Sequence, residues 1–335
     1  EQLRINAENL IEKLAVTGEL NNLSFSELRD RILENRPRQT YRQLSDSIIE
    51  ELTAANKLGN ASCYKQAQTF LDKHSGKKEI YFEQIDFRLL KKLETAHLAA
   101  GNAYNSLSFY LRTIRSVFNR AIKEKLVSPE YYPFREYSIK QTKTAKRAVS
   151  KEAINIIRNL SLEPESPRWH VRNMFMFSFF TMGMNYADMA YLKHSNISQG
   201  RIEYTRAKTG KVYSVQITPQ TQEIIDMYTT KEKTPDDYIF PVLKRTTPEL
   251  MMQDLQNGRR NFNKLLGKIA KQAKLDVHLT SYVARHSWAT IAKDLNVPIS
   301  VISQGLGHED IKTTQIYLDS FDKEVIDKAN QIITL

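Results

Sequence analysis

Residues 279–318 read LTSYVARHSWATIAKDLNVPISVISQGLGHEDIKTTQIYL, and this stretch decides which fold and chemistry we expect. It holds an arginine-histidine pair, Arg285 and His286, then Gly307-His308, and nine residues after His308 a tyrosine, Tyr317. Its apolar spacing predicts two or three short helices. These would bring a guanidinium, an imidazole and a phenol together, a set that suits attack by tyrosine on a phosphate held by cations.

Each of these side chains also has an ordinary structural interpretation. Tyr317 is one of 16 tyrosines, so only its spacing from His308 singles it out. His308 alone could be a core or capping histidine. Arg285 lies among apolar neighbours, where an arginine is unusual unless it is paired or faces a ligand. The alternative for Arg285 is a surface position.

Length and composition narrow the class of protein. A chain of 335 residues predicts two domains, and 41% hydrophobic residues support buried cores. The net charge of +11 favours a polyanionic partner over a merely basic surface.

The single cysteine, Cys63, excludes an internal disulfide, so no oxidising compartment is needed. The sequence has no apolar run of the roughly 18 residues that span a membrane and no signal peptide, so no membrane partner is expected. Because it begins with Glu1, we expect a fragment of a longer protein.

Apolar periodicity predicts a mostly α fold with a small β-hairpin, an α+β class. Helical pieces are expected over residues 6–33, with Ser24 and Glu27 at capping-box spacing. Residues 40–126 predict four helices, the first with an apolar stripe between Leu44 and Leu52. The others are predicted at about 62–74, 87–100 and 105–125. A second domain starts near Ser150 and includes a buried helix at 169–181, a helix from 188, a hairpin of strands 201–204 and 211–217, and helices at 218–228 and 260–273.

Positive charge is concentrated between residues 103 and 150. Ten Lys and Arg against three Asp and Glu give a balance of +7 there. Residues 139–149, IKQTKTAKRAV, carry four cations and no acid. We favour a segment that follows a phosphate backbone over a solvated linker. The candidate DNA contacts are Arg112, Arg115, Arg120, Lys140, Lys143, Lys146 and Arg147, with Arg259 and Arg260 in the second domain.

Other phosphate and metal chemistries fit the sequence poorly. Lys208 lies in RAKTGK, but Thr205 stands where a nucleotide-binding loop needs glycine. The histidines lack the cysteines or close spacing of a zinc site. No acidic cluster suits magnesium. Phosphate chemistry here would therefore use Arg, Lys and His, with no metal and no cofactor.

The order Arg-His, Leu-Gly-His and Tyr resembles the tyrosine recombinases, the phage-integrase family. From about Thr40 onward the chain is most similar to integrases of conjugative transposons and related bacterial mobile elements. The resemblance implies an N-terminal four-helix core-binding domain and a catalytic domain. The expected division is 1–38, a helical coupling segment or remnant of an upstream arm-binding domain; 39–137, the core-binding (SAM-like) domain; 138–150, a basic linker; 151–321, the catalytic domain; and 322–335, a C-terminal helix or tail.

The resemblance also implies roles for individual residues. Tyr317 matches the nucleophile, which forms a 3′-phosphotyrosyl link and frees a 5′-hydroxyl. Arg285 matches the second of the family's two arginines, and His308 the histidine that precedes the nucleophile. Lys208 matches the hairpin lysine that protonates the leaving oxygen. Neither ATP nor metal is implied, because the phosphotyrosine conserves the bond energy.

Two positions depart from the family pattern. Tyr282 stands where the family usually has histidine or lysine, and a phenol brings no cation at neutral pH. The family's first arginine is expected within residues 181–185, and none is present. Losing one such donor can cost roughly 3 kcal/mol, about a hundredfold in rate.

We expect Arg206 to substitute for the missing arginine. It lies two residues before Lys208, and alternate residues of a strand share one face. Arg259 and Arg260 are the fallback candidates, and Asn185 could add a neutral hydrogen bond.

The function implied is site-specific recombination of duplex DNA through a Holliday junction, for integration, excision or inversion of a mobile element. The expected assembly is a homo-tetramer on paired core sites, with accessory DNA-bending or directionality proteins. The implied location is the bacterial cytoplasm, associated with the nucleoid. A helix at about 323–333 would dock on a neighbouring subunit or on its own domain. The alternative is a catalytically weak or inactive DNA-binding regulator with the recombinase fold, which the missing arginine motivates.

Overall fold

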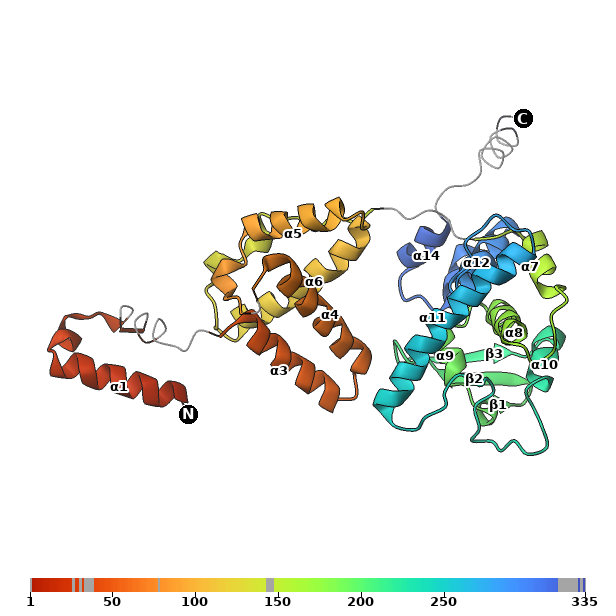
Figure 1. The fold of residues 1–335 in the computed structure, drawn as a ribbon, viewed down its shortest axis with the longest axis horizontal. Helices are drawn as coiled ribbons and strands as arrows, with labels where there is room; N and C mark the ends of the chain where they lie inside the picture. Colours follow the sequence, from red (N-terminus) through yellow and green to blue (C-terminus); the bar gives the residue numbers. More distant parts are fainter. Residues whose placement is uncertain are drawn as a thin grey trace. The chain divides into compact units, whose positions relative to one another are not determined.

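The structure, a computed structural model, describes residues 2–25, 28–29, 32, 39–77, 79–142, 148–318, 331 and 334. The chain divides into two compact units, residues 1–143 and 144–335 (Figure 1). The described residues are mostly helical with one small sheet, which confirms the expected fold class. None of their helices is long and apolar enough to cross a membrane.

The predicted four helices are present in the first unit. They are α3 (Tyr41–Ala54), α4 (Leu58–Ser75), α5 (Phe87–Ala99) and α6 (Tyr104–Lys123). Helix α6 contacts the other three, and its side chains Leu111, Ile114 and Phe118 are fully buried. Helix α3 begins at the capping box that Thr40 forms with Gln43. Before them lie α1 (Gln2–Val16) and η1 (Glu19–Asn22), whereas Glu27 of the predicted capping box lies outside the described residues.

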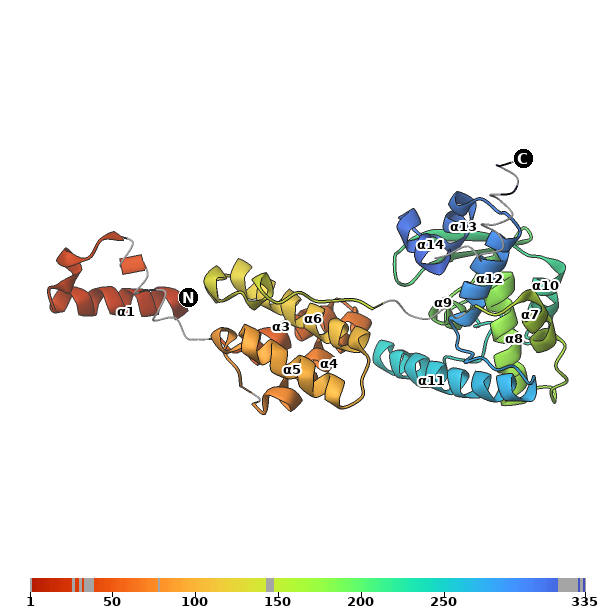
Figure 2. The same ribbon diagram turned by 90° about the horizontal axis from the view of Figure 1, so that it is seen from above.

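The second unit is built around the predicted buried helix, α8 (Pro167–Phe180), in which Phe175 and Phe177 are fully buried. This helix packs among α7 (Lys151–Arg158), α10 (Pro219–Asp226), α11 (Pro248–Gln272) and α12 (Val283–Asp294) (Figure 2). The Ser287 hydroxyl of α12 accepts a hydrogen bond from the Val149 N–H (2.9 Å), which fixes the start of the unit. The short α9 (Tyr186–Ala190) follows α8.

Helix α11 begins at Pro248, twelve residues before the predicted start at 260. Thr247 is its N-cap, and Pro248 and Glu249 occupy the first turn, where proline and acidic residues are favoured. The fully buried side chains of α11 start only at Phe262. The apolar stripe therefore marked only the second half of this helix.

The predicted hairpin is confirmed as β2 (Arg201–Thr205) and β3 (Val212–Gln216). A two-residue strand, β1 (Ile197–Ser198), pairs with β2 and completes an antiparallel sheet of order β1-β2-β3. Two residues are too short to show periodicity, so the sequence did not indicate β1. Three helices form the 279–318 stretch, namely α12, α13 (Ile299–Leu306) and α14 (Ile311–Leu318).

Helix α7 offers a matched test of this packing, because Ile157 is fully buried whereas Ile156 is 46% exposed. Ile157→Ala should lower the free energy of unfolding by about 2–5 kcal/mol, since it leaves a cavity. Ile156→Ala should change it by about 0.5 kcal/mol or less. Calorimetry of the full chain measures both variants, and equal effects would contradict this orientation of α7.

Candidate active site

Arg285 of α12 is the most constrained side chain of the candidate site. It is 4% exposed. Its Nη1 donates to the Gly183 carbonyl (3.1 Å), and its Nη2 donates to the Leu306 carbonyl and to His308 Nε2 (3.1 Å). Its Nε is buried with no hydrogen-bond partner among the described residues. A buried donor without a partner costs free energy that a bound anion would remove.

The chain after α8 passes unusually close to Arg285. Gly183 has a φ of +78°, and a Cβ there would lie 2.6 Å from both Cβ and Cγ of Arg285. Only glycine fits this position, because it avoids both the contact and the left-handed strain. The segment that lacks the family's first arginine, residues 181–185, therefore lies directly against Arg285.

His308 is held in one orientation and one tautomer. It follows Gly307, whose left-handed backbone ends α13. Because arginine can only donate, His308 Nε2 accepts from Arg285, so the proton lies on Nδ1 and is shared with Thr314 Oγ1 (2.9 Å). Burial, then the charges of Arg285 and Arg206, lower the pKa of His308 to about 4. The imidazole is therefore neutral at neutral pH.

Arg206 turns from the end of β2 into the same cluster, and its side chain is 11% exposed. The Asn185 side-chain oxygen accepts from its Nε (3.2 Å) and Nη2 (2.7 Å). Asp188 Oδ2 lies 3.8 Å from Nε, and Asp188 Oδ1 accepts from the Ala207 N–H (3.1 Å). Burial raises the pKa of Asp188, while Ala207 and Arg206 oppose that rise. The guanidinium of Arg206 thus contacts the segment from which an arginine is missing.

The expectation that Arg206 and Lys208 share a strand face is wrong. Strand β2 ends before both residues, and the Arg206 carbonyl accepts from the N–H groups of Thr209 (3.2 Å) and Gly210 (2.9 Å). This tight turn, with Gly210 at a φ of +69°, leaves Lys208 exposed at its tip. Arg206 therefore reaches the cluster on its own, and Lys208 stays outside it.

The remaining two predicted residues lie on α14 and at the start of α12. Tyr317 is in the last turn of α14, and its side chain is outside the described part of the structure. Tyr282 occupies the N-cap position of α12 and is 39% exposed. Its ring meets His286 edge-on, with centroids 4.9 Å apart.

Comparison with known proteins shows the family of this chain. Residues 147–324 match the phage integrase family, and residues 40–141 match the phage integrase SAM-like domain. The chain belongs to the phage integrase family. It is similar to tyrosine recombinase XerD of Staphylococcus aureus, with 24% identity over 294 residues that cover 84% of this chain and 94% of the relative.

Two solved structures share the fold. A lambda integrase tetramer bound to a Holliday junction matches with a TM-score of 0.59 and 14% identity, covering 94% of this chain and 88% of that one. The Tn1549 transposon integrase in complex with circular intermediate DNA gives a TM-score of 0.59 and 12% identity, covering 87% and 99%. At these identities the likeness establishes the fold.

In this phage integrase family member, Arg120 differs from the other candidate DNA contacts. Its Nη1 and Nη2 donate to Glu51 (2.7 and 2.6 Å), and its Nε donates to Glu124 (2.6 Å). The bonds from Arg120 lower the pKa of Glu51. The guanidinium thus joins α6 to α3, which gives Arg120 a structural role.

The other candidate DNA contacts in the described residues are exposed. They lie on α6, after it and on α11, and are Arg112, Arg115, Lys140, Arg259 and Arg260. Lys143, Lys146 and Arg147 lie outside the described residues, as does most of the C-terminal segment 322–335. In the described ranges, no group of three or more His, Cys, Asp or Glu is placed to hold a metal ion.

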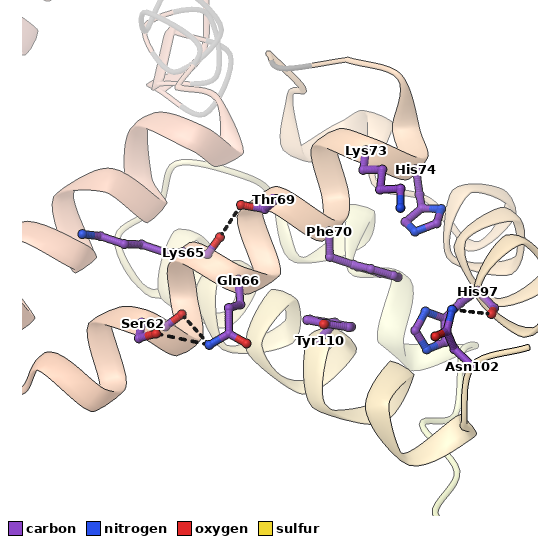
Figure 3. A pocket seen from close by; sticks show the side chains of 10 residues that line it. All are labelled: Ser62, Lys65, Gln66, Thr69, Phe70, Lys73, His74, His97, Asn102 and Tyr110. Atoms are coloured by element: carbon purple, nitrogen blue, oxygen red, sulfur yellow. Dashed lines mark hydrogen bonds between the residues drawn. The ribbon is translucent and has the colours of Figure 1, made fainter. Parts of the chain in front are cut away.

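A hollow of about 420 Å³ in the first unit was not indicated by sequence reasoning. At its centre, Phe70 of α4 stacks on Tyr110 of α6, with centroids 4.4 Å apart and planes 7° apart (Figure 3). Lys65 and Lys73, both exposed on α4, are part of its lining. Their spacing of eight residues, which is close to two helical turns, was the available signal.

The pKa of His308 predicts a pH effect on stability. Between about 4 and the ordinary value of 6.5, the unfolded chain binds a proton at His308 that the folded chain does not. The free energy of unfolding therefore rises with pH across this window and falls on acidification. His308→Gln should lose less thermal stability than the parent between pH 7 and 4.5, whereas His278→Gln, which changes an exposed histidine, should match the parent. Identical pH profiles for the parent and His308→Gln would contradict the assigned environment.

Proposed function

We propose that this protein is a site-specific DNA recombinase that cleaves and rejoins duplex DNA through a 3′-phosphotyrosyl intermediate. Tyr317 attacks the phosphorus, its proton passes to a base, and the bond to the 5′-oxygen breaks. The observation that carries the proposal is Arg285, buried beside a neutral histidine, with no partner for its Nε among the described residues, in the unit that contains the Tyr317 helix. Family membership supports it independently.

Arg285 and Arg206 are proposed to hold the two non-bridging oxygens of the scissile phosphate. Both guanidiniums lie close enough to His308 to lower its pKa, so their charges act on one region. Asp188 balances part of that charge. Positioned donors of this kind stabilise the extra negative charge of the transition state more than the ground state.

His308 is proposed to be the base that takes the proton of Tyr317. It is already neutral, so its lone pair is available once Arg285 turns to the phosphate. A phosphate bound between Arg285 and Arg206 offsets the charges that lower the pKa of His308. Substrate binding should therefore make the imidazole a stronger base.

Lys208 is proposed to protonate the leaving 5′-oxygen, which an exposed hairpin tip suits because bound DNA can reach it. Tyr282 is proposed as a neutral hydrogen-bond donor at the position of the usual histidine or lysine. The exposed cations of α6, α11 and the segment after α6 would contact the phosphate backbone. Lys65 and Lys73, at the α4–α6 hollow, would add to that surface.

The assembly and domain roles follow by analogy. The lambda integrase forms a tetramer on a Holliday junction, and we propose the same for this chain on paired core sites of a mobile element, in the bacterial cytoplasm. The proposed domains are a core-binding domain at 39–137, a linker at 138–150 and a catalytic domain at 151–321. Residues 1–38 would be a coupling segment, and 322–335 a tail that docks in cis or in trans. Accessory proteins would set the direction of the reaction.

The second candidate is a DNA-binding regulator that has lost cleavage. The observation that favours it is the absence of arginine from residues 181–185. The two candidates differ in one measurable product, a covalent link between Tyr317 and DNA.

Covalent capture decides between the two. We expect the chain, incubated with nicked duplexes of randomised sequence, to form a DNA adduct that resists denaturing electrophoresis. Tyr317→Phe should form none, because it lacks the attacking oxygen. Sequencing the trapped DNA gives the target site for later assays. Tight DNA binding by the parent with no adduct would make it a regulator.

On the captured site, Arg206→Ala should slow cleavage about a hundredfold or more, as expected for the loss of one donor to the transition state. Arg201→Ala, which removes an exposed arginine from β2, should have little effect. Asn185→Arg in the Arg206→Ala background should restore part of the rate, because residue 185 contacts the space that the lost guanidinium filled. Cleavage by Arg206→Ala at the parent rate would refute this role.

A further inference from the structure

Tyr213 of β3 connects the hairpin to the loop that carries His308. Its backbone pairs with Tyr204 of β2, and the two rings stack with centroids 5.3 Å apart and planes 20° apart. Its hydroxyl donates to the Gly307 carbonyl (3.1 Å) and lies 3.5 Å from the Leu306 carbonyl. One side chain thus spans two segments more than 90 residues apart in sequence.

The Tyr213 hydroxyl and Arg285 contact the same short segment, residues 306–307. The Leu306 carbonyl accepts from Arg285 Nη2, and a carbonyl oxygen has two lone pairs. A Cβ at Gly307, whose φ is +66°, would lie 1.3 Å from the Tyr213 oxygen. Glycine is therefore needed at this position for two reasons: its left-handed backbone ends α13, and its lack of a Cβ leaves room for the Tyr213 hydroxyl.

The hairpin is held at its two ends by different contacts. Arg206 is held separately by Asn185 and Asp188. The Ala207 N–H, next to Lys208, also donates to Asp188 Oδ1 (3.1 Å), and the other hydrogen bonds of the turn lie within the hairpin itself. Among the described residues, the hydrogen bond from Tyr213 to the Gly307 carbonyl joins the hairpin to the His308 loop.

We propose that Tyr213 is a positioning residue for strand cleavage, which acts by holding the Lys208 hairpin at the site formed by His308 and Arg285. The inference rests on the proposed function. In the cleavage step, the bond from the Tyr317 oxygen to phosphorus forms as the bond from phosphorus to the 5′-oxygen breaks. The tyrosine proton goes to His308, and the leaving oxygen takes a proton from Lys208. A loosely held Lys208 slows only the second transfer.

Changing the leaving atom of the substrate distinguishes this positioning role from a general structural role of Tyr213. If sulfur replaces the bridging 5′-oxygen, the group leaves as a thiolate. Thiols have a pKa of about 8.5 against about 15.7 for water, so a thiolate needs no protonation. A defect confined to Lys208 should therefore vanish on the sulfur substrate.

The test uses the full chain and nicked duplexes of the captured site, with oxygen or sulfur at the bridging position. Tyr213→Phe keeps the stacked ring and removes the hydroxyl. It should cleave the oxygen substrate roughly tenfold to a hundredfold more slowly, as misplacement of a reacting group does. It should cleave the sulfur substrate at the parent rate and bind DNA with unchanged affinity. Lys208→Ala should behave alike, and Tyr191→Phe, an exposed tyrosine after α9, should match the parent on both.

A second measurement guards against a folding defect. Added to Lys208→Ala, Tyr213→Phe should slow cleavage of the oxygen substrate no further, since both changes remove one function. Equal slowing of Tyr213→Phe on oxygen and sulfur, additive effects with Lys208→Ala, or no slowing at all would overturn the positioning role. Failure of the parent to form any adduct with either substrate would instead refute the proposed function.

Discussion

The site depends on the hydrogen bonds that Arg285 donates to two backbone carbonyls. One belongs to Gly183, after α8, and the other to Leu306, at the end of α13. Through them a single guanidinium joins the central helix, α12 and the His308 loop. A buried arginine that donates to two main-chain carbonyls is held close to them, and its Nε has no hydrogen-bond partner among the described residues.

Keeping two guanidiniums near one histidine has an electrostatic consequence. Their charges, added to burial, drive His308 to its neutral form, which Arg285 then stabilises by donating to Nε2. Asp188 is the neutralising charge on the Arg206 side, where burial would otherwise favour its protonated form. The cluster therefore carries two positive charges against one acid among the described residues. An anion is the ligand class that its unused donor and its like charges favour.

The sequence predicted the elements with strong periodicity and the residues that belong to a spaced motif. The four helices of the first unit and α8 followed from apolar stripes, and the pairing of Arg285 with His308 agrees with their order in the motif, whereas the role of Tyr317 stays a prediction. Features without a local signature were missed. The first half of α11 carries no apolar stripe, so its start was predicted too late. The prediction that Arg206 and Lys208 share a strand face was wrong because the strand ends before either residue. Tyr213 could not be predicted, since its importance comes from a contact with Gly307 that only the folded chain creates.

In the proposed mechanism, Arg206 takes the role of the arginine that is absent from residues 181–185. Stabilising a phosphate requires a guanidinium at one point, and the chain can bring one there from any segment that reaches it. Here the end of β2 lies beside Asn185, so a side chain from the hairpin enters the space next to residues 181–185. In the proposed mechanism this gives the hairpin two duties. Arg206, held by Asn185 and Asp188, would stabilise charge, and Lys208 at the tip would donate a proton. The Tyr213 hydroxyl, which donates to the Gly307 carbonyl, would then hold the proton donor near the loop that carries the base.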